Sequence, residues 1–401
     1  MITIGSYLHR KEFEDLIWRW MHGQVKEDDP ETVTKLIHFN SIYTSRYLDM
    51  WSRQLFTALS HTETTSVAVK TKAELKDALV SYPHYHNERI DNLIRKYIAN
   101  RQNYYIETPI NAKLFFCGQN MEHRLVGTNR IKRTRRLAEK ASRRIIDHIF
   151  ESIKKKAEKL ADLRAEKAGI KLSQLVTPPE QMIREFEDAE KKIVDDLKTG
   201  KTLPRIHPSP INDVAGLKII LESEQKSELF DYIETRTCCD VIEIEPHKSE
   251  HYNATNLILR CRPKKDILFS EPIDIELIKA MRSRGLWQSD IQLDFEKFVL
   301  SGEDDIYMEI IYSSYEDILE SEIGLSMHED RIIDQRQKQQ YKGHLAGNIE
   351  FLIQYLFTFA SFPSKNLYEL PIKLWTRYLP DYFEETLRKC YRLNNPSIYS
   401  P

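Results

Sequence analysis

Asp213 is the first residue whose type and position could do chemistry. It lies in the stretch SPINDVAGLKIILESE (209–224), directly before a β-type run, where a loop enters a strand. A carboxylate at such a point can hold a metal ion, and Gly216 lets a second backbone or a nucleotide approach closely because it has no Cβ. Asp213 is therefore a candidate ligand for a divalent cation.

Glu309 is the second candidate, in the stretch DDIYMEIIYSS (304–314). Side chains alternate between the two faces of a strand, so Glu309 is expected on the same face as Tyr307 and Ile311. A carboxylate among apolar neighbours is costly unless it is paired, protonated or bound to a cation, and this favours a functional role. A solvent-exposed glutamate at the end of a strand remains the alternative.

Two further candidates lie between these carboxylates, in EIEPHKSEHYNATNLIL (243–259). Tyr252 directly precedes a β-type run and offers an aromatic face on which a base can stack. Lys248, four residues upstream, offers a point charge for a phosphate. A tyrosine beside a turn is also common in proteins without any ligand. Tyr252 and Lys248 are therefore candidates only in combination with the two carboxylates.

Charge is sorted along the chain although the net charge is only −2. The run RIKRTRRLAEKASRR (130–144) carries eight Lys or Arg and a single Glu, whereas residues 303–322 are strongly acidic. The overall balance gives no general attraction to nucleic acid or to a membrane, so such a partner would have to meet a local patch. The basic run is either a phosphate-binding element or a solvated helix face.

The elements that must position these residues suggest an α+β fold. Residues 1–120 repeat apolar positions at helical spacing and predict a helical N-terminal region. Residues 121–335 predict a core with a mixed β-sheet, built from β-type runs at 215–221, 238–245, 254–262 and 305–313, with interleaved helices. A helical hairpin is expected as an insertion at about 145–203, and residues 336–401 predict a C-terminal helical region.

Other features exclude some classes of protein. The five cysteines are odd in number and lack metal-ligand spacing, so they predict reduced thiols in a cytoplasmic protein rather than a disulfide framework or a zinc site. The longest apolar stretch, 351–362, is too short to span a membrane.

Two further groups of residues are given structural interpretations. His84 and His86 are interpreted as part of an interhelical loop. His328 and Glu329 are interpreted as helix-packing residues, and the alternative for these two is a place in the acceptor pocket.

Four segments together resemble the synthetase domain of the RelA/SpoT alarmone synthetases, which transfer pyrophosphate from ATP to the 3′-hydroxyl of GTP or GDP. INDVAGLKII is similar to that family's Asp-Ile-Ala-Gly-Val-Arg-Ile strand, and KSEHYNATNLIL to its Lys-x-x-Gly-Tyr-Arg-Ser-x-His segment. YMEIIYSS is similar to Val-Glu-x-Gln-x-Arg-Thr. NRIKRTRRLAEK is similar to the donor-phosphate segment, Arg-x-Lys followed by a later Ser and Lys.

The resemblance implies a nucleotidyltransferase-like core with ATP-dependent pyrophosphokinase activity and Mg²⁺ as the cofactor. Asp213 matches the magnesium-binding aspartate and Glu309 the catalytic glutamate, so both are expected to hold the metal. Tyr252 matches the tyrosine that stacks on the acceptor base. The other nucleotide-binding residues expected from the match are Arg130, Lys132, Lys140, Lys218, Lys248 and Asn256.

The chain also departs from the family pattern, and this leaves three functions open. Asn253 and Asn256 replace an Arg and a His of the family segment, and Arg136 replaces the donor-segment Ser. The chain is expected to be an alarmone synthetase, a toxin-type relative that pyrophosphorylates tRNA, or a catalytically degenerate nucleotide sensor or scaffold. Expected partners are ATP with GTP, GDP or another acceptor; tRNA, an antitoxin and a second copy of the chain are further candidates.

Overall fold

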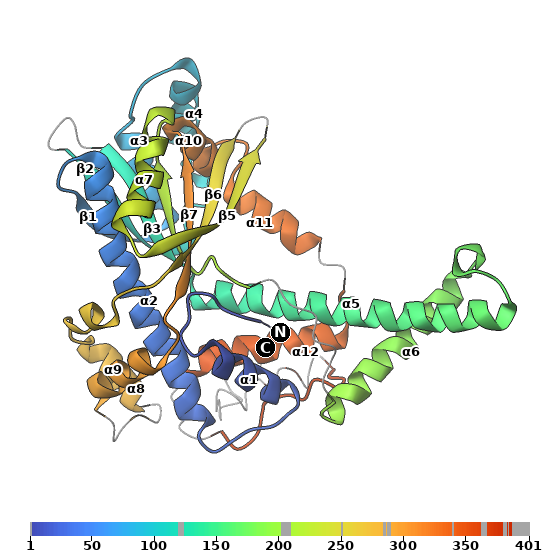
Figure 1. The fold of residues 1–401 in the computed structure, drawn as a ribbon. Helices are drawn as coiled ribbons and strands as arrows, with labels where there is room; N and C mark the ends of the chain where they lie inside the picture. The colour runs from blue at the N-terminus through green and yellow to red at the C-terminus, as the bar shows by residue number, and fades with distance from the viewer. Residues whose placement is uncertain are drawn as a thin grey trace, which may run out of the picture.

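The computed structural model describes most of the chain (Figure 1). The described residues are 2–118, 124–201, 210–249, 252–283, 286, 290–338, 341–361, 367–379, 383 and 385–386. Every structural statement below concerns these residues.

A seven-stranded mixed sheet lies at the centre of the fold (Figure 1). In spatial order the strands are β1 (Thr65–Thr71), β2 (Pro109–Cys117), β3 (Arg124–Ile131), β4 (Ala215–Ile220), β7 (Ile306–Ser313), β6 (Asn253–Cys261) and β5 (Cys239–Lys248). The central neighbours β4 and β7 are parallel, and all other neighbouring strands are antiparallel. Parallel strands start at the same end of a sheet, so residues that enter β4 and β7 lie close together.

Helices cover both faces of the sheet, because apolar residues project from each. On one face the alternating residues Leu217, Ile219, Met308 and Ile310 pack against α2 (Asp29–Ser60), α7 (Lys226–Arg236), α8 (Ile275–Ser283) and α9 (Ile291–Ser301). On the other face, Leu114 and its neighbours pack against α3 (Lys72–Ser81), α4 (Glu88–Ala99) and α10 (Tyr315–Ile323). The short helix α11 (His328–Gln337) follows α10.

A second apolar core lies beside the sheet and carries a projecting arm (Figure 1). It joins α1 (Arg10–Met21), α5 (Thr134–Ala168), α6 (Pro179–Lys198) and α12 (His344–Phe359). With 35 residues, α5 is about 52 Å long and extends well beyond α12. It ends at Gly169, whose φ of 69° is the left-handed conformation that favours glycine, and α6 then starts with a proline in its first turn and folds back along α5.

Most of the predicted elements are confirmed. The four β-type runs form β4, β5, β6 and β7, and the helical hairpin is α5 and α6, although α5 already starts at Thr134. The chain is a mixed α and β protein, as predicted. Helix α12 confirms the start of the C-terminal helical region, whereas residues 387–401 lie outside the described part.

Two predictions need correction. Residues 1–120 are not purely helical, because β1 and β2 lie within them and pair with each other at one side of the sheet. The cysteines are not all reduced, because Cys239 and Cys261 form a disulfide between β5 and β6, where the strand register places them directly opposite. Within the described residues, no helix is both long and apolar enough to cross a membrane.

Candidate functional site

The parallel pairing of β4 and β7 places Glu309 beside the strand that Asp213 precedes. Gly216 of β4 pairs with Glu309 of β7, and on its other side Gly216 pairs with Arg130 of β3. Directly paired residues point to the same face, so Arg130 and Glu309 flank a glycine that places no side chain between them. A Cβ on Gly216 would lie 3.7 Å from Oε2 of Glu309. Asp213 stands three residues before Gly216, where the chain enters β4.

Two lysines hold Asp213. Nζ of Lys132 donates to Oδ2 of Asp213 at 2.7 Å, and Nζ of Lys140 donates to the same oxygen. Lys132 follows the end of β3, and its backbone N–H also donates to the carbonyl of Val214 at 2.7 Å, which fixes the two chain segments side by side. Lys140 comes from the second turn of α5. The basic run at 130–144 therefore supplies cations to this site.

The electrostatics of the group favour a charged carboxylate between charged lysines. Burial raises the pKa of Asp213, but Lys132 and Lys140 outweigh it and hold that pKa well below its usual range. Burial, together with the neighbouring Lys140, lowers the pKa of Lys132 to about 8 against the attraction of Asp213. These three side chains form a partly buried cluster with one more positive than negative charge.

The pKa of Glu309 is shifted in the opposite direction from that of Asp213. Burial and the negative charge of Asp213 raise its pKa, against the opposing effect of Arg130, Lys132 and Lys140. Its only hydrogen bond to a described side chain is a long one, 3.5 Å from Nδ2 of Asn256 on β6 to Oε1. A carboxylate with a raised pKa and little hydrogen bonding is suited to accept a proton from a bound hydroxyl group.

The two carboxylates fit a magnesium ion by their chemistry. Oδ1 of Asp213 is buried and has no hydrogen-bond partner among the described residues. Carboxylate oxygens are the ligands that Mg²⁺ prefers, and it usually takes only one or two of them together with water and substrate phosphates. Within the described residues no group of three or more His, Cys, Asp or Glu is placed to hold a metal. Asp213 and Glu309 are thus the residues that would hold the ion.

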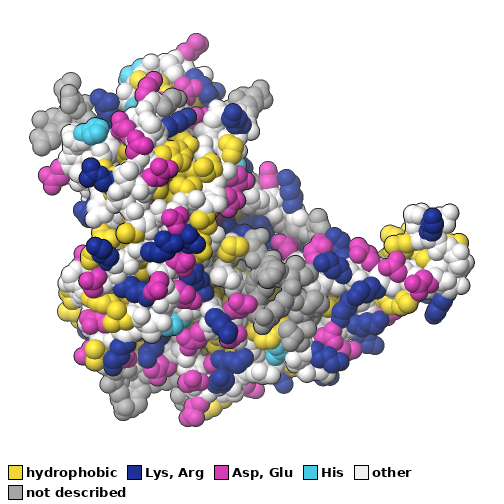
Figure 2. All heavy atoms as spheres, in the orientation of Figure 1, with side chains coloured by type: hydrophobic (Ala, Val, Ile, Leu, Met, Phe, Trp, Pro, Cys, Tyr) yellow, Lys and Arg dark blue, Asp and Glu magenta, His cyan; other side chains and the backbone are white. Residues whose placement is uncertain are grey.

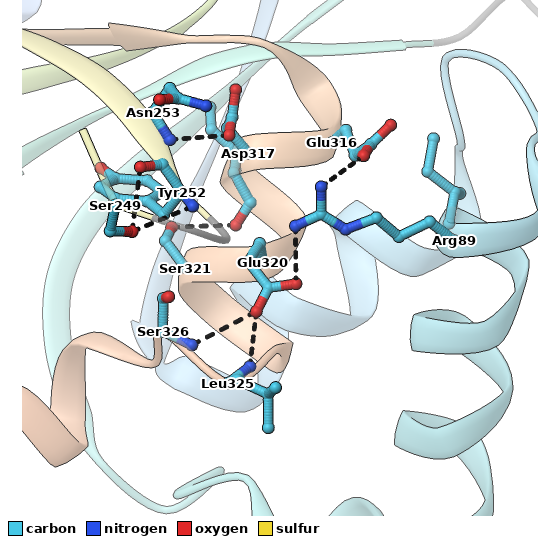
Figure 3. A network of polar contacts seen from close by, with 12 residues as sticks. Arg89, Ser249, Tyr252, Asn253, Glu316, Asp317, Glu320, Ser321, Leu325 and Ser326 are labelled. Atoms are coloured by element: carbon cyan, nitrogen blue, oxygen red, sulfur yellow. Dashed lines mark hydrogen bonds and ion pairs between the residues drawn. The ribbon is translucent and has the colours of Figure 1, made fainter. Parts of the chain in front are cut away.

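Tyr252, the predicted stacking residue, lies just before β6 and is 7 % exposed. Ser249 holds its backbone: the hydroxyl of Ser249 accepts from the N–H of Tyr252 at 3.1 Å (Figure 3). The guanidinium of Arg331, from α11, lies 5.3 Å from the centre of the Tyr252 ring. A base stacked on that side of the ring would have to take the place of this guanidinium.

The remaining predicted residues divide into two groups. Arg130 lies in the site, and its guanidinium makes no hydrogen bond or ion pair with a described residue. Lys218 lies on the same face, two residues beyond Gly216. Lys248 is exposed at the end of β5, and no described interaction joins it to the two carboxylates.

A buried ionic cluster next to the site was not predicted. Nζ of Lys218 donates to Oε1 of Glu322 at 2.8 Å, and Lys72 of α3 contacts the other oxygen of Glu322 at 2.5 Å. Lys72 also contacts Glu329 at 3.2 Å, and Lys76 contacts Glu329 at 3.8 Å. Lysines on one face of a helix normally indicate a solvated surface, so no local signal in residues 72–76 could have placed them inside.

A tight turn between α10 and α11 sets the position of this cluster (Figure 3). Oε1 of Glu320 accepts the backbone N–H groups of Leu325 at 2.6 Å and Ser326 at 3.3 Å, and Arg89 of α4 donates to its other oxygen at 3.2 Å. A Cβ on Gly324 would lie 2.3 Å from the carboxyl carbon of Glu320. A larger residue at Gly324 would push the Glu320 carboxylate out of this turn, which carries His328, Glu329 and Arg331 to the site.

The comparison with known proteins adds no family to this description. No protein-family model, no curated protein and no solved structure matches this chain. The resemblance to the alarmone synthetases therefore depends on the sequence segments and on the geometry above.

Proposed function

We propose that this chain transfers a pyrophosphoryl group from ATP to the 3′-hydroxyl of a nucleotide acceptor. One observation carries the proposal: Asp213 directly precedes β4, and Glu309 lies in the parallel neighbour β7 opposite Gly216, with cations on both sides. Phosphoryl transfer needs this combination, because the protein contributes mainly positioning and charge neutralisation. The resemblance of the segments 129–140, 211–220, 248–259 and 307–314 to the alarmone synthetases supports the same activity.

The residues divide into roles that follow from their charges. Asp213 and Glu309 would hold Mg²⁺, which would neutralise charge on the donor phosphates. Lys132 and Lys140 bind those phosphates, and Arg130 faces the transferred group from the neighbouring strand. Glu309 takes the proton from the acceptor hydroxyl. The acceptor oxygen attacks the β-phosphorus of ATP, the bond between the α,β-bridging oxygen and that phosphorus breaks, and AMP leaves.

The test uses the full chain with γ-labelled ATP, Mg²⁺ and, in separate reactions, GTP, GDP, adenosine nucleotides and total tRNA. The expected result is label on one acceptor class together with an equal amount of AMP. Label on inorganic phosphate alone would show hydrolysis and overturn the proposal. Binding of ATP without any transfer would also overturn it, in favour of a nucleotide sensor or scaffold.

A tRNA acceptor is included for a specific reason. Arg133 and Arg135 are exposed immediately beside Lys132, where they can meet a phosphate backbone. The projecting arm does not extend this basic surface, since Lys or Arg and Asp or Glu side chains are interspersed along it (Figure 2). An RNA acceptor would therefore be held close to the site rather than along the arm.

Replacing Arg331 with alanine should lower the KM for the acceptor by about twofold to fivefold, because a cation over an aromatic ring is stabilising and the incoming base must displace it. The KM for ATP should not change. Initial rates at varied acceptor concentration provide the measurement, and Arg282→Ala, an exposed arginine on α8, is the control. A raised acceptor KM would mean that Arg331 binds the acceptor instead of covering its site.

A further inference from the structure

We propose that Lys218, Arg130, Lys72 and the first turn of α11 form a second anion-binding site, which takes a phosphate group of the acceptor nucleotide. The assignment to an acceptor depends on the function proposed above, whereas anion binding itself does not. The site is separate from the lysines that hold Asp213. It lies on the same face of the sheet as Glu309 and extends from Arg130 towards Lys218, away from Asp213.

The first argument is an imbalance of charge in a buried cluster. Three lysines, Lys72, Lys76 and Lys218, share two carboxylates, those of Glu322 and Glu329. The side chains are between 0 % and 19 % exposed, so water screens the excess positive charge poorly. Buried charges are normally paired, because an unpaired ion loses its hydration without compensation. Burial lowers the pKa of Lys76, so the excess positive charge is carried mainly by Lys72 and Lys218, and a bound anion would balance it.

The second argument is the gathering of cations around His328. Burial and the positive charges of Arg130, Lys72 and Lys218 lower the pKa of His328 well below its usual range, against the weaker opposing effect of Glu322. The ring is therefore neutral at neutral pH and does not add to the positive charge. Arg130 has no hydrogen-bond or ion-pair partner among the described residues. Its guanidinium, with five N–H donors, is free to bind an anion.

The third argument concerns the N-terminus of helix α11. Helix α11 begins at His328, and its N-cap residue Met327 makes no side-chain hydrogen bond to the first turn. The first N–H groups of this ten-residue helix have no hydrogen-bond partner among the described residues, and the helix dipole adds positive potential at this end. The two acidic side chains of that turn are used elsewhere: Glu329 pairs with the lysines, and Asp330 accepts from the hydroxyl of Tyr105 at 2.5 Å.

The position of this site indicates which of the two substrates would bind there. Along β4, Asp213 precedes Gly216 and Lys218 follows it. The two groups of cations therefore lie on opposite sides of the pair formed by Gly216 and Glu309. A donor triphosphate held by Lys132 and Lys140 leaves the second group for the other substrate. The acceptor should therefore carry a phosphate of its own, as a nucleotide or an RNA end does and a nucleoside does not.

The binding test uses inorganic pyrophosphate as the probe and calorimetry without Mg²⁺. Lys140→Met weakens the donor end, and this variant should still bind pyrophosphate. Adding Lys218→Met should weaken the remaining binding by about tenfold or more, since a charge-assisted contact is lost. Unchanged binding in the double variant would overturn the proposal. Should the double variant fail to fold, Lys140→Met with Arg130→Gln replaces it, because Arg130 has no side-chain partner among the described residues.

Two more readouts separate a ligand site from a structural one. Lys218→Met removes the excess charge, so the melting temperature without ligand should stay or rise; a clear fall, with pyrophosphate binding retained, would show a purely structural lysine. In the transfer assay the variant should raise the acceptor KM at least tenfold and leave the ATP KM unchanged. A raised ATP KM alone would assign the site to the donor. Pyrophosphate binding without any transfer would refute the enzymatic function and keep the anion site.

Discussion

Replacing Asp213 with asparagine is expected to lower the rate of pyrophosphoryl transfer by about 10³-fold or more, because a charged metal ligand and its electrostatic effect are lost together. The substitution keeps the size of the side chain but removes the charge that two lysines share. It leaves Lys132 and Lys140 without a carboxylate, so their mutual repulsion also disturbs the donor site. Release of AMP and label transfer measure the effect.

The chain contains a matched control for this experiment. Asp240 on β5 also accepts from two cations, Arg260 at 2.8 Å and Arg262 at 3.1 Å, but it is exposed at the far side of the sheet. Asp240→Asn should leave the rate within a factor of about two, since exposed ion pairs contribute little. If Asp213→Asn retains most of the activity, or if Asp240→Asn loses as much, Asp213 does not carry the chemistry.

Replacing Glu322 with glutamine is expected to destabilise the protein by about 3–5 kcal/mol, because it leaves two buried lysines facing a neutral group. Lys72 and Glu322 are only 4 % and 1 % exposed, and the pair joins α3 to α10 across 250 residues of sequence. Urea unfolding followed by circular dichroism measures the free energy of unfolding. Glu316→Gln is the control: its pair with Arg89 is far more exposed, so the loss should stay below about 1 kcal/mol.

Glu322 should also account for part of the loss of protein stability at acidic pH. Burial alone would raise the pKa of Glu322, but Lys218 and Lys72 hold it well below the ordinary value of 4.5. A lowered folded-state pKa means that the stabilisation is fully present above pH 4.5 and is lost as the pH falls towards the folded-state pKa. When the pH is lowered from 5, the free energy of unfolding of the Glu322→Gln variant should therefore fall less than that of the wild type. An unchanged acid dependence would contradict the depressed pKa.

The sequence could predict the elements with strong local patterns. The β-type runs at 215–221 and 305–313 form β4 and β7, and the hairpin of α5 and α6 follows from helical periodicity with a proline at the start of the second arm. Edge strands carry a weaker pattern: in β1 most side chains are at least partly exposed, so its seven residues do not show the alternation of a half-buried strand. This explains why β1 was not predicted. The inner strands β2 and β3 were not predicted either, although several of their residues are buried.

The sequence by itself determined the residue types of the candidate site, with Asp213 before one strand, Glu309 within another and a basic segment ahead of both. Only the tertiary structure decided that β4 and β7 are parallel neighbours, which places Glu309 beside the strand that Asp213 precedes. It alone decided that Lys72 and Glu322 meet inside the protein and that Cys239 lies opposite Cys261. The physical reason is that periodicity and capping depend on neighbouring residues, whereas strand order and buried ion pairs depend on segments far apart in the chain.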